Sequence, residues 1–120
     1  MTVKLKDFSA ANRRRCESPE GFDHRFDEWS KAEWSNALAG EAGEACNLTK
    51  KMLRHEKGSR GNVKPEDQDY ESLRRRAAKE AADAIIYADL LIQALGFEPS
   101  EVVREVFDSK SEQIGWPERL

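Results

Sequence analysis

Apolar residues recur at intervals of three and four positions along most of the chain, which is the spacing of one face of an amphipathic helix. The pattern predicts four helices, over about 22–38 (or 27–38), 41–53, 65–95 and 99–114. Gly40 and Gly43 mark a joint, either a kink or a new helix start, and the polar, glycine-containing segment at about 56–65 predicts a flexible loop. Gly96 provides a stop signal after the third helix.

The two ends of the chain do not follow this pattern. Residues 1–21 carry few apolar positions, a basic triplet and a Ser-Pro-Glu-Gly turn signal, so they are interpreted as an irregular N-terminal arm. Residues 22–117 are expected to form one helical domain, and residues 118–120 a short tail. One such domain is the natural count for a chain of 120 residues.

Composition agrees with an all-α fold, because strand-forming Val, Ile and Thr are scarce. The 20 basic and 23 acidic residues give a net charge of −3, without the basic excess of a general nucleic-acid binder. No apolar run approaches the ~20 residues of a membrane-spanning helix, and the N-terminus lacks the apolar segment of a secretory signal. Two cysteines without a CxxC partner fit free thiols in the cytoplasm.

Two pairs of acidic residues stand out because the members of each pair are three positions apart. Glu41 and Glu44 form an ExxE motif, and Glu80 and Asp83 form an ExxD motif. Residues at this spacing share one face of a helix. Small Ala and Gly neighbours would let two helices approach closely, so the sequence predicts that the four carboxylates meet at one point.

Such a cluster requires a cation, because converging carboxylates repel one another. All-oxygen donors favour Mg²⁺, with Mn²⁺ as a substitute, over zinc or copper. Because Mg²⁺ also favours substrate phosphates, metal-assisted phosphate chemistry is the functional interpretation. A di-iron centre is excluded, since neither His24 nor His55 follows a glutamate at the Glu-x-x-His spacing. The alternative is that these acids are solvated surface charge, which is common in acidic helices.

The sequence around the two motifs resembles that of the all-α nucleoside triphosphate pyrophosphohydrolases of the MazG type. The resemblance covers roughly residues 22–117, and the N-terminal segment is similar to small phage-encoded members of the group. It lies in four stretches, namely Trp29–Ala45 with its Gly-Glu-Ala-Gly-Glu text, Lys50-Lys51, Glu80–Leu91, and Phe107–Pro117.

This resemblance implies a four-helix-type bundle completed by oligomerisation. It implies hydrolysis of a nucleoside triphosphate to the monophosphate and pyrophosphate. The expected triphosphates are those of deoxynucleotides or of non-standard nucleotides. The residues that match the family's Mg²⁺ ligands are Glu41, Glu44, Glu80 and Asp83. Either Glu41 or Glu44 would orient or deprotonate the attacking water. The expected location is the cytoplasm of a bacterial cell, or of the host cell if the chain is phage-encoded.

The chain departs from the family pattern in two places. The interval between the ExxE and ExxD motifs is longer than is common, and the extra length falls at about 58–69. Many relatives carry Lys-Phe-Asn near the last helix, where this chain has Val106-Phe107-Asp108. Lys110, about one turn later, is the candidate replacement for the missing phosphate-binding lysine.

Four further residues are candidate substrate contacts. Lys51 lies seven positions after Glu44 on the same helix face and can meet a phosphate, although a solvated cation near a helix end is the alternative. Tyr87 follows Asp83 by one turn. Trp34 can stack on a base, although core packing is the more common role of tryptophan. Arg15 can clamp phosphates, although a charged tail is the default for its basic triplet.

Large apolar residues cover these helices thinly, so a homodimer or homotetramer is expected. A nucleoside triphosphate is the expected small-molecule partner, with no membrane and no nucleic acid. Two other functions stay open. The helices can form a non-catalytic interaction module whose acids serve solubility or a basic partner, and Arg13–Arg15 can bind nucleic acid.

Overall fold

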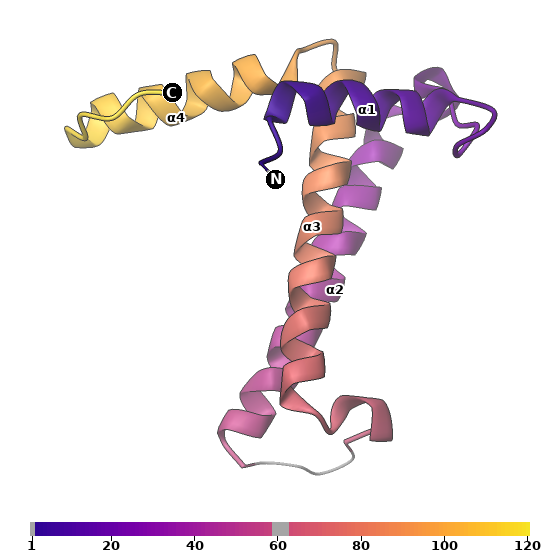
Figure 1. The fold of residues 1–120 in the computed structure, drawn as a ribbon, viewed down its shortest axis with the longest axis vertical. Coiled ribbons are helices and arrows are strands. Elements are labelled where there is room, and N and C mark those ends of the chain that lie inside the picture. The colour runs from indigo at the N-terminus through magenta and orange to yellow at the C-terminus, as the bar shows by residue number, and fades with distance from the viewer. Residues whose placement is uncertain (1, 59–62) are drawn as a thin grey trace. The chain divides into compact units, whose positions relative to one another are not determined.

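The computed structural model describes residues 2–58 and 63–120. Over these residues the chain is helical, without strands, which confirms the all-α class (Figure 1). The elements are, in order, α1 (Leu5–Glu17), η1 (Phe26–Glu28), α2 (Lys31–Glu56), η2 (Pro65–Asp67), α3 (Tyr70–Ala94) and α4 (Pro99–Ile114), where η marks a single 3₁₀ turn. None of the helices in this part of the chain combines the length and apolar character needed to cross a bilayer.

The helices form two compact units. The hairpin unit comprises Ser35–Ala88, and the terminal unit comprises the residues up to Trp34 together with Asp89–Leu120.

In the hairpin unit, α2 and α3 lie side by side (Figure 1). Leu48 of α2 packs with Leu73 and Ala77 of α3, and the half-buried Met52 packs against them. Leu73 is completely buried, so the helix pair is held by a small apolar contact near its loop end.

No new helix starts at Gly40 or Gly43, because α2 continues through both glycines, which corrects that expectation. Neither glycine serves a close helix approach in the described structure, since a Cβ at either position would meet nothing within 4 Å. A glycine inside a helix costs only about 1 kcal/mol relative to alanine, which neighbouring helical turns easily offset.

The segment between α2 and α3 differs in detail from the prediction. The expected helix start at Pro65 is a 3₁₀ turn, and α3 begins at Tyr70. The predicted loop at 56–65 falls between the end of α2 and this turn, with its centre, 59–62, outside the described residues. By contrast, α4 has the predicted bounds, and Gly115 ends it in the left-handed conformation with φ 74°.

The expectation of an irregular arm over 1–21 is wrong, because the terminal unit opens with the 13-residue helix α1. Its buried face carries Ser9, Asn12 and Cys16 rather than large apolar residues. Ser9 and Asn12 can be buried because both bond to Asp89. Its carboxylate accepts hydrogen bonds from the Ser9 hydroxyl, from Asn12 Nδ2 at 3.0 Å and from Gln93 Nε2 at 2.8 Å. A pattern based on apolar residues cannot detect a helix that is fixed in this way.

Candidate metal centre

Three carboxylates meet on the facing sides of α2 and α3 in the hairpin unit. Glu41 and Glu44 come from α2 and Glu80 from α3, and one oxygen of each lies within 4.8 Å of the other two. The ExxE spacing places both α2 residues on one helix face, and the pairing of the helices brings Glu80 to them. The sequence therefore identified three acids that the fold brings together.

The negative charges of the cluster make it harder for Glu44 to lose its proton. The pKa of Glu44 is raised above its usual value, first by a hydrogen bond with the Glu80 carboxyl and then by the negative charge of Glu80. The partial loss of water and the charge of Asp83 act in the same direction, whereas a hydrogen bond with Glu41 acts against them. Two carboxylates can share a hydrogen bond only with a proton between them, so the cluster favours added positive charge.

Asp83, the fourth expected ligand, is exposed and lies outside this group of converging oxygens. It comes one turn after Glu80 on α3, and its charge reaches Glu44. In the described structure Asp83 therefore contributes to the field of the cluster and is not one of its three meeting acids.

The residues present fit a hard divalent cation. The three converging groups are all carboxylates, which Mg²⁺ and Mn²⁺ prefer. No Lys or Arg within the described ranges forms an ion pair with any of the four motif acids. Glu44 is exposed while Glu41 and Glu80 are half-buried, so water and substrate oxygens can complete a coordination shell.

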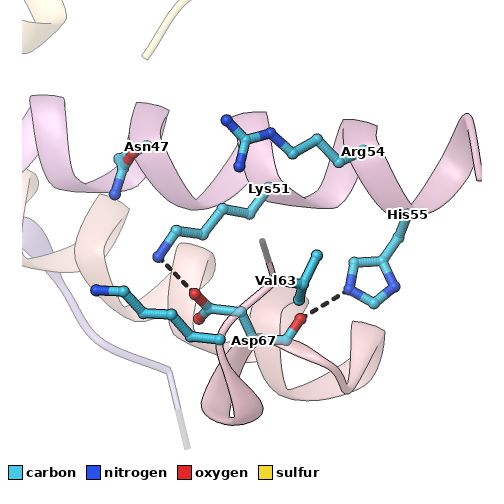
Figure 2. Close-up of a pocket in the computed structure, with 7 residues that line it drawn as sticks. Asn47, Lys51, Arg54, His55, Val63 and Asp67 are labelled. Atoms are coloured by element: carbon cyan, nitrogen blue, oxygen red, sulfur yellow. Dashed lines mark hydrogen bonds and ion pairs between the residues drawn. The ribbon is translucent and has the colours of Figure 1, made fainter. Parts of the chain in front are cut away.

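A pocket of about 210 Å³ lies nearer the loop end of the hairpin unit (Figure 2). We call it the basic pocket, and its lining residues are Asn47, Lys51, Arg54, His55, Val63, Lys64 and Asp67. Asp67 anchors it, because this residue is only 3% exposed and one carboxylate oxygen lies 2.7 Å from Lys51 Nζ. Its other oxygen accepts a hydrogen bond from Arg76 at 3.1 Å.

The stability of the protein at acidic pH should depend on the buried ion pair between Asp67 and Lys51. The pKa of Asp67 is held below its usual value mainly by the hydrogen bond from Lys51 and, more weakly, by Arg76. Because the folded-state pKa lies below that of the unfolded chain, the stabilisation is complete above about pH 4 and is lost as the pH falls through the folded value. Asp67→Asn should lower the free energy of unfolding by about 3 kcal/mol near neutral pH.

Urea denaturation of both proteins between about pH 7 and pH 2 measures this difference. The gap between wild type and Asp67→Asn should shrink towards acid, because the wild type loses its carboxylate there. A gap of constant size at every pH would contradict the assignment. Glu101→Gln, an exposed change on α4, is the control.

The remaining candidate contacts are divided between the two units. In the hairpin unit, Lys51 is half-buried and forms an ion pair with Asp67. Tyr87 is also half-buried, one turn after Asp83. In the terminal unit, the Arg15 guanidinium lies 5.4 Å from the centre of the Phe22 ring, and Lys110 Nζ donates to Gln113 Oε1 at 3.0 Å.

Trp34 offers no ring face to a base in this structure, which corrects its expected stacking role. It is 1% exposed and belongs to the terminal unit. Its ring contacts those of His24, Phe26 and Trp29, with centroids 5.2, 5.5 and 4.7 Å away. Trp34 is therefore a core residue.

Sequence reasoning missed the role of Asp67. Asp67 falls at the start of the helix predicted over about 65–95, but it lies in a 3₁₀ turn and is buried against two cations. Its partners are 16 positions before it and 9 positions after it, so no local pattern reveals the pairing.

Comparisons with protein-family models, with curated proteins and with solved structures gave no match.

Proposed function

We propose that the protein hydrolyses nucleoside triphosphates to the monophosphate and pyrophosphate, with Mg²⁺ bound at Glu41, Glu44 and Glu80. The observation that carries this proposal is the convergence of the three carboxylates from two helices, with the pKa of Glu44 raised by Glu80. The three carboxylates repel one another, and no Lys or Arg among the described residues forms an ion pair with them, which favours a divalent cation. Deoxynucleotides or non-standard nucleotides are the proposed substrates.

When held by Glu41, Glu44 and Glu80, Mg²⁺ would act as a Lewis acid and offset the negative charge that develops during the reaction. Glu41 and Glu80 are half-buried, so their positions are more restricted, and we assign them to hold and orient the cation. Glu44 is the most exposed of the three and is the one that water reaches most easily. We therefore assign Glu44 to accept a proton from the attacking water.

In this reaction, the water oxygen bonds to the α-phosphorus as its proton passes to Glu44. The bond from that phosphorus to the oxygen bridging the α- and β-phosphates breaks. The electron pair leaves with pyrophosphate, and the nucleoside monophosphate retains the water oxygen.

A panel of ribo- and deoxyribonucleoside triphosphates with Mg²⁺ tests the proposal, with the monophosphate and pyrophosphate measured as separate products. We expect both products in equal amounts from at least one nucleotide. Glu44→Gln should reduce the rate by about 100-fold or more, because the amide cannot accept the proton. Turnover of no nucleotide, production of diphosphate and phosphate, or full activity of Glu44→Gln would contradict the proposal.

We also propose that copies of the chain associate into a homodimer or homotetramer. The terminal unit supports this association, because two apolar residues of α4 are largely exposed, Val106 at 63% and Ile114 at 69%. These residues, with Phe107 and Trp116, line an open apolar groove of about 810 Å³. Exposed apolar surface of this kind favours burial against another chain.

A further inference from the structure

We propose that the basic pocket binds the pyrophosphate portion of the substrate, which is the group released as product. This inference rests on the proposed function, and it assigns the part of the substrate that lies beyond the metal. It depends on three observations in the hairpin unit: the charge of the pocket, its position along α2 and its built geometry.

The first observation is an excess of positive charge. Lys51, Arg54 and Lys64 line the pocket together with one acid, Asp67. That acid is already neutralised, because its two oxygens pair with Lys51 at 2.7 Å and with Arg76 at 3.1 Å. Arg54 and Lys64 form no ion pair with the residues that the structure describes. The pocket therefore holds two uncompensated cations, which is complementary to a multiply charged anion.

The second observation is that the spacing along α2 places three residues of the pocket on the same helix face as Glu44. Glu44, Asn47, Lys51 and Arg54 are separated by three, four and three positions. Side chains at these intervals share a helix face. The rise of an α-helix puts Lys51 about 10 Å from Glu44 along the axis. A phosphate chain held at the acids thus meets the Asn47 amide first and the cations next.

The third observation is that the base of the pocket is fixed by its own hydrogen bonds. The Asp67 carbonyl oxygen only accepts, so His55 Nε2 donates to it at 2.7 Å. Asp67 also holds the ammonium group of Lys51, whose side chain is 22% exposed. Figure 2 shows Asn47, Lys51 and Arg54 extending from α2, with Asp67 opposite Lys51. The anchoring of Lys51 reduces the ordering that anion binding would otherwise require.

The surplus charge distinguishes this pocket from an ordinary set of solvated lysines. A buried carboxylate that served only folding would be satisfied by Lys51 and Arg76. Arg54 and Lys64 add two cations beside that completed pair, and Arg54 offers a planar donor group suited to phosphate oxygens. Pyrophosphate, with several oxygens on two linked phosphorus atoms, can meet both cations at once.

Calorimetric titration with sodium pyrophosphate tests the inference. It is performed with EDTA and without Mg²⁺, so that the three acids cannot bind the anion through a metal. The test variant is Arg54→Gln/Lys64→Gln, in which both changed residues are exposed. The matched control is Lys50→Gln/Arg75→Gln, which removes the same charges from exposed positions of α2 and α3 outside the pocket.

We expect saturable binding to the wild type and an affinity at least about 10-fold lower for the pocket variant. The control should stay within about 2-fold of the wild type, because it changes only long-range screened charge. Thermal unfolding verifies that both variants are folded. Absence of binding to the wild type, or equal losses in the two variants, overturns the inference.

The same titration separates this inference from the proposed function. A wild type that hydrolyses nucleotides but binds no pyrophosphate overturns the pocket assignment and leaves the hydrolase proposal in place. A wild type that binds pyrophosphate through Arg54 and Lys64 but hydrolyses no nucleotide supports the pocket and contradicts the hydrolase proposal.

Discussion

Glu80→Gln is expected to reduce nucleotide hydrolysis by about 100-fold or more while leaving the metal-free protein at least as stable as the wild type. The first effect follows because an amide carries no charge and is a weaker partner for Mg²⁺. The second follows because the charge of Glu80 and its hydrogen bond are the main causes of the raised pKa of Glu44. Removing a repelling charge does not weaken the fold.

These opposite effects distinguish a metal site from a structural role. Hydrolysis is measured with saturating Mg²⁺, and thermal unfolding is measured in EDTA. Glu101→Gln, an exposed glutamate on α4, is the matched control and should change neither quantity. A Glu80→Gln protein that is clearly less stable in EDTA yet fully active would show that Glu80 supports folding rather than chemistry.

Trp34→Ala is expected to lower the free energy of unfolding by about 3–5 kcal/mol, the largest stability effect of any single change considered. Trp34 is 1% exposed, and its ring contacts three other aromatic rings of the terminal unit. Its Nε1–H also donates to the Phe26 carbonyl oxygen at 3.3 Å. Truncation would leave a cavity and an unpaired acceptor at the same point.

Urea denaturation followed by circular dichroism measures this loss. Phe97→Ala is the control, because Phe97 is 62% exposed and its removal should change stability by no more than about 0.5 kcal/mol. Trp34→Phe should recover part of the loss by refilling the cavity. A stable Trp34→Ala protein with a raised KM for nucleotides would instead restore Trp34 as a base-stacking residue.

The sequence predicted those features that depend on local periodicity. The apolar spacing after Pro99 and the glycine at position 115 predicted α4 with its correct bounds. The intervals within ExxE and ExxD predicted which acids share a helix face, and three of them converge. Such features require only 3.6 residues per turn and the conformational preferences of Gly and Pro.

The features that sequence reasoning missed depend on polar contacts between distant residues. Residues 5–17 were interpreted as irregular because their buried face carries Ser9 and Asn12, whose acceptor, Asp89, lies 80 and 77 positions later in the sequence. Asp67 was missed for the same reason, since its burial depends on Lys51 and Arg76. Apolar periodicity contains no information about which polar residue will receive a buried partner.

Titration with Mn²⁺, followed by electron paramagnetic resonance, detects metal bound at the three carboxylates without any assumption about substrate. We expect saturable Mn²⁺ binding to the wild type that Mg²⁺ displaces and that Glu44→Gln/Glu80→Gln abolishes. Equal Mn²⁺ binding by the wild type and by that double variant, or no saturable binding by the wild type, would contradict the proposed metal site.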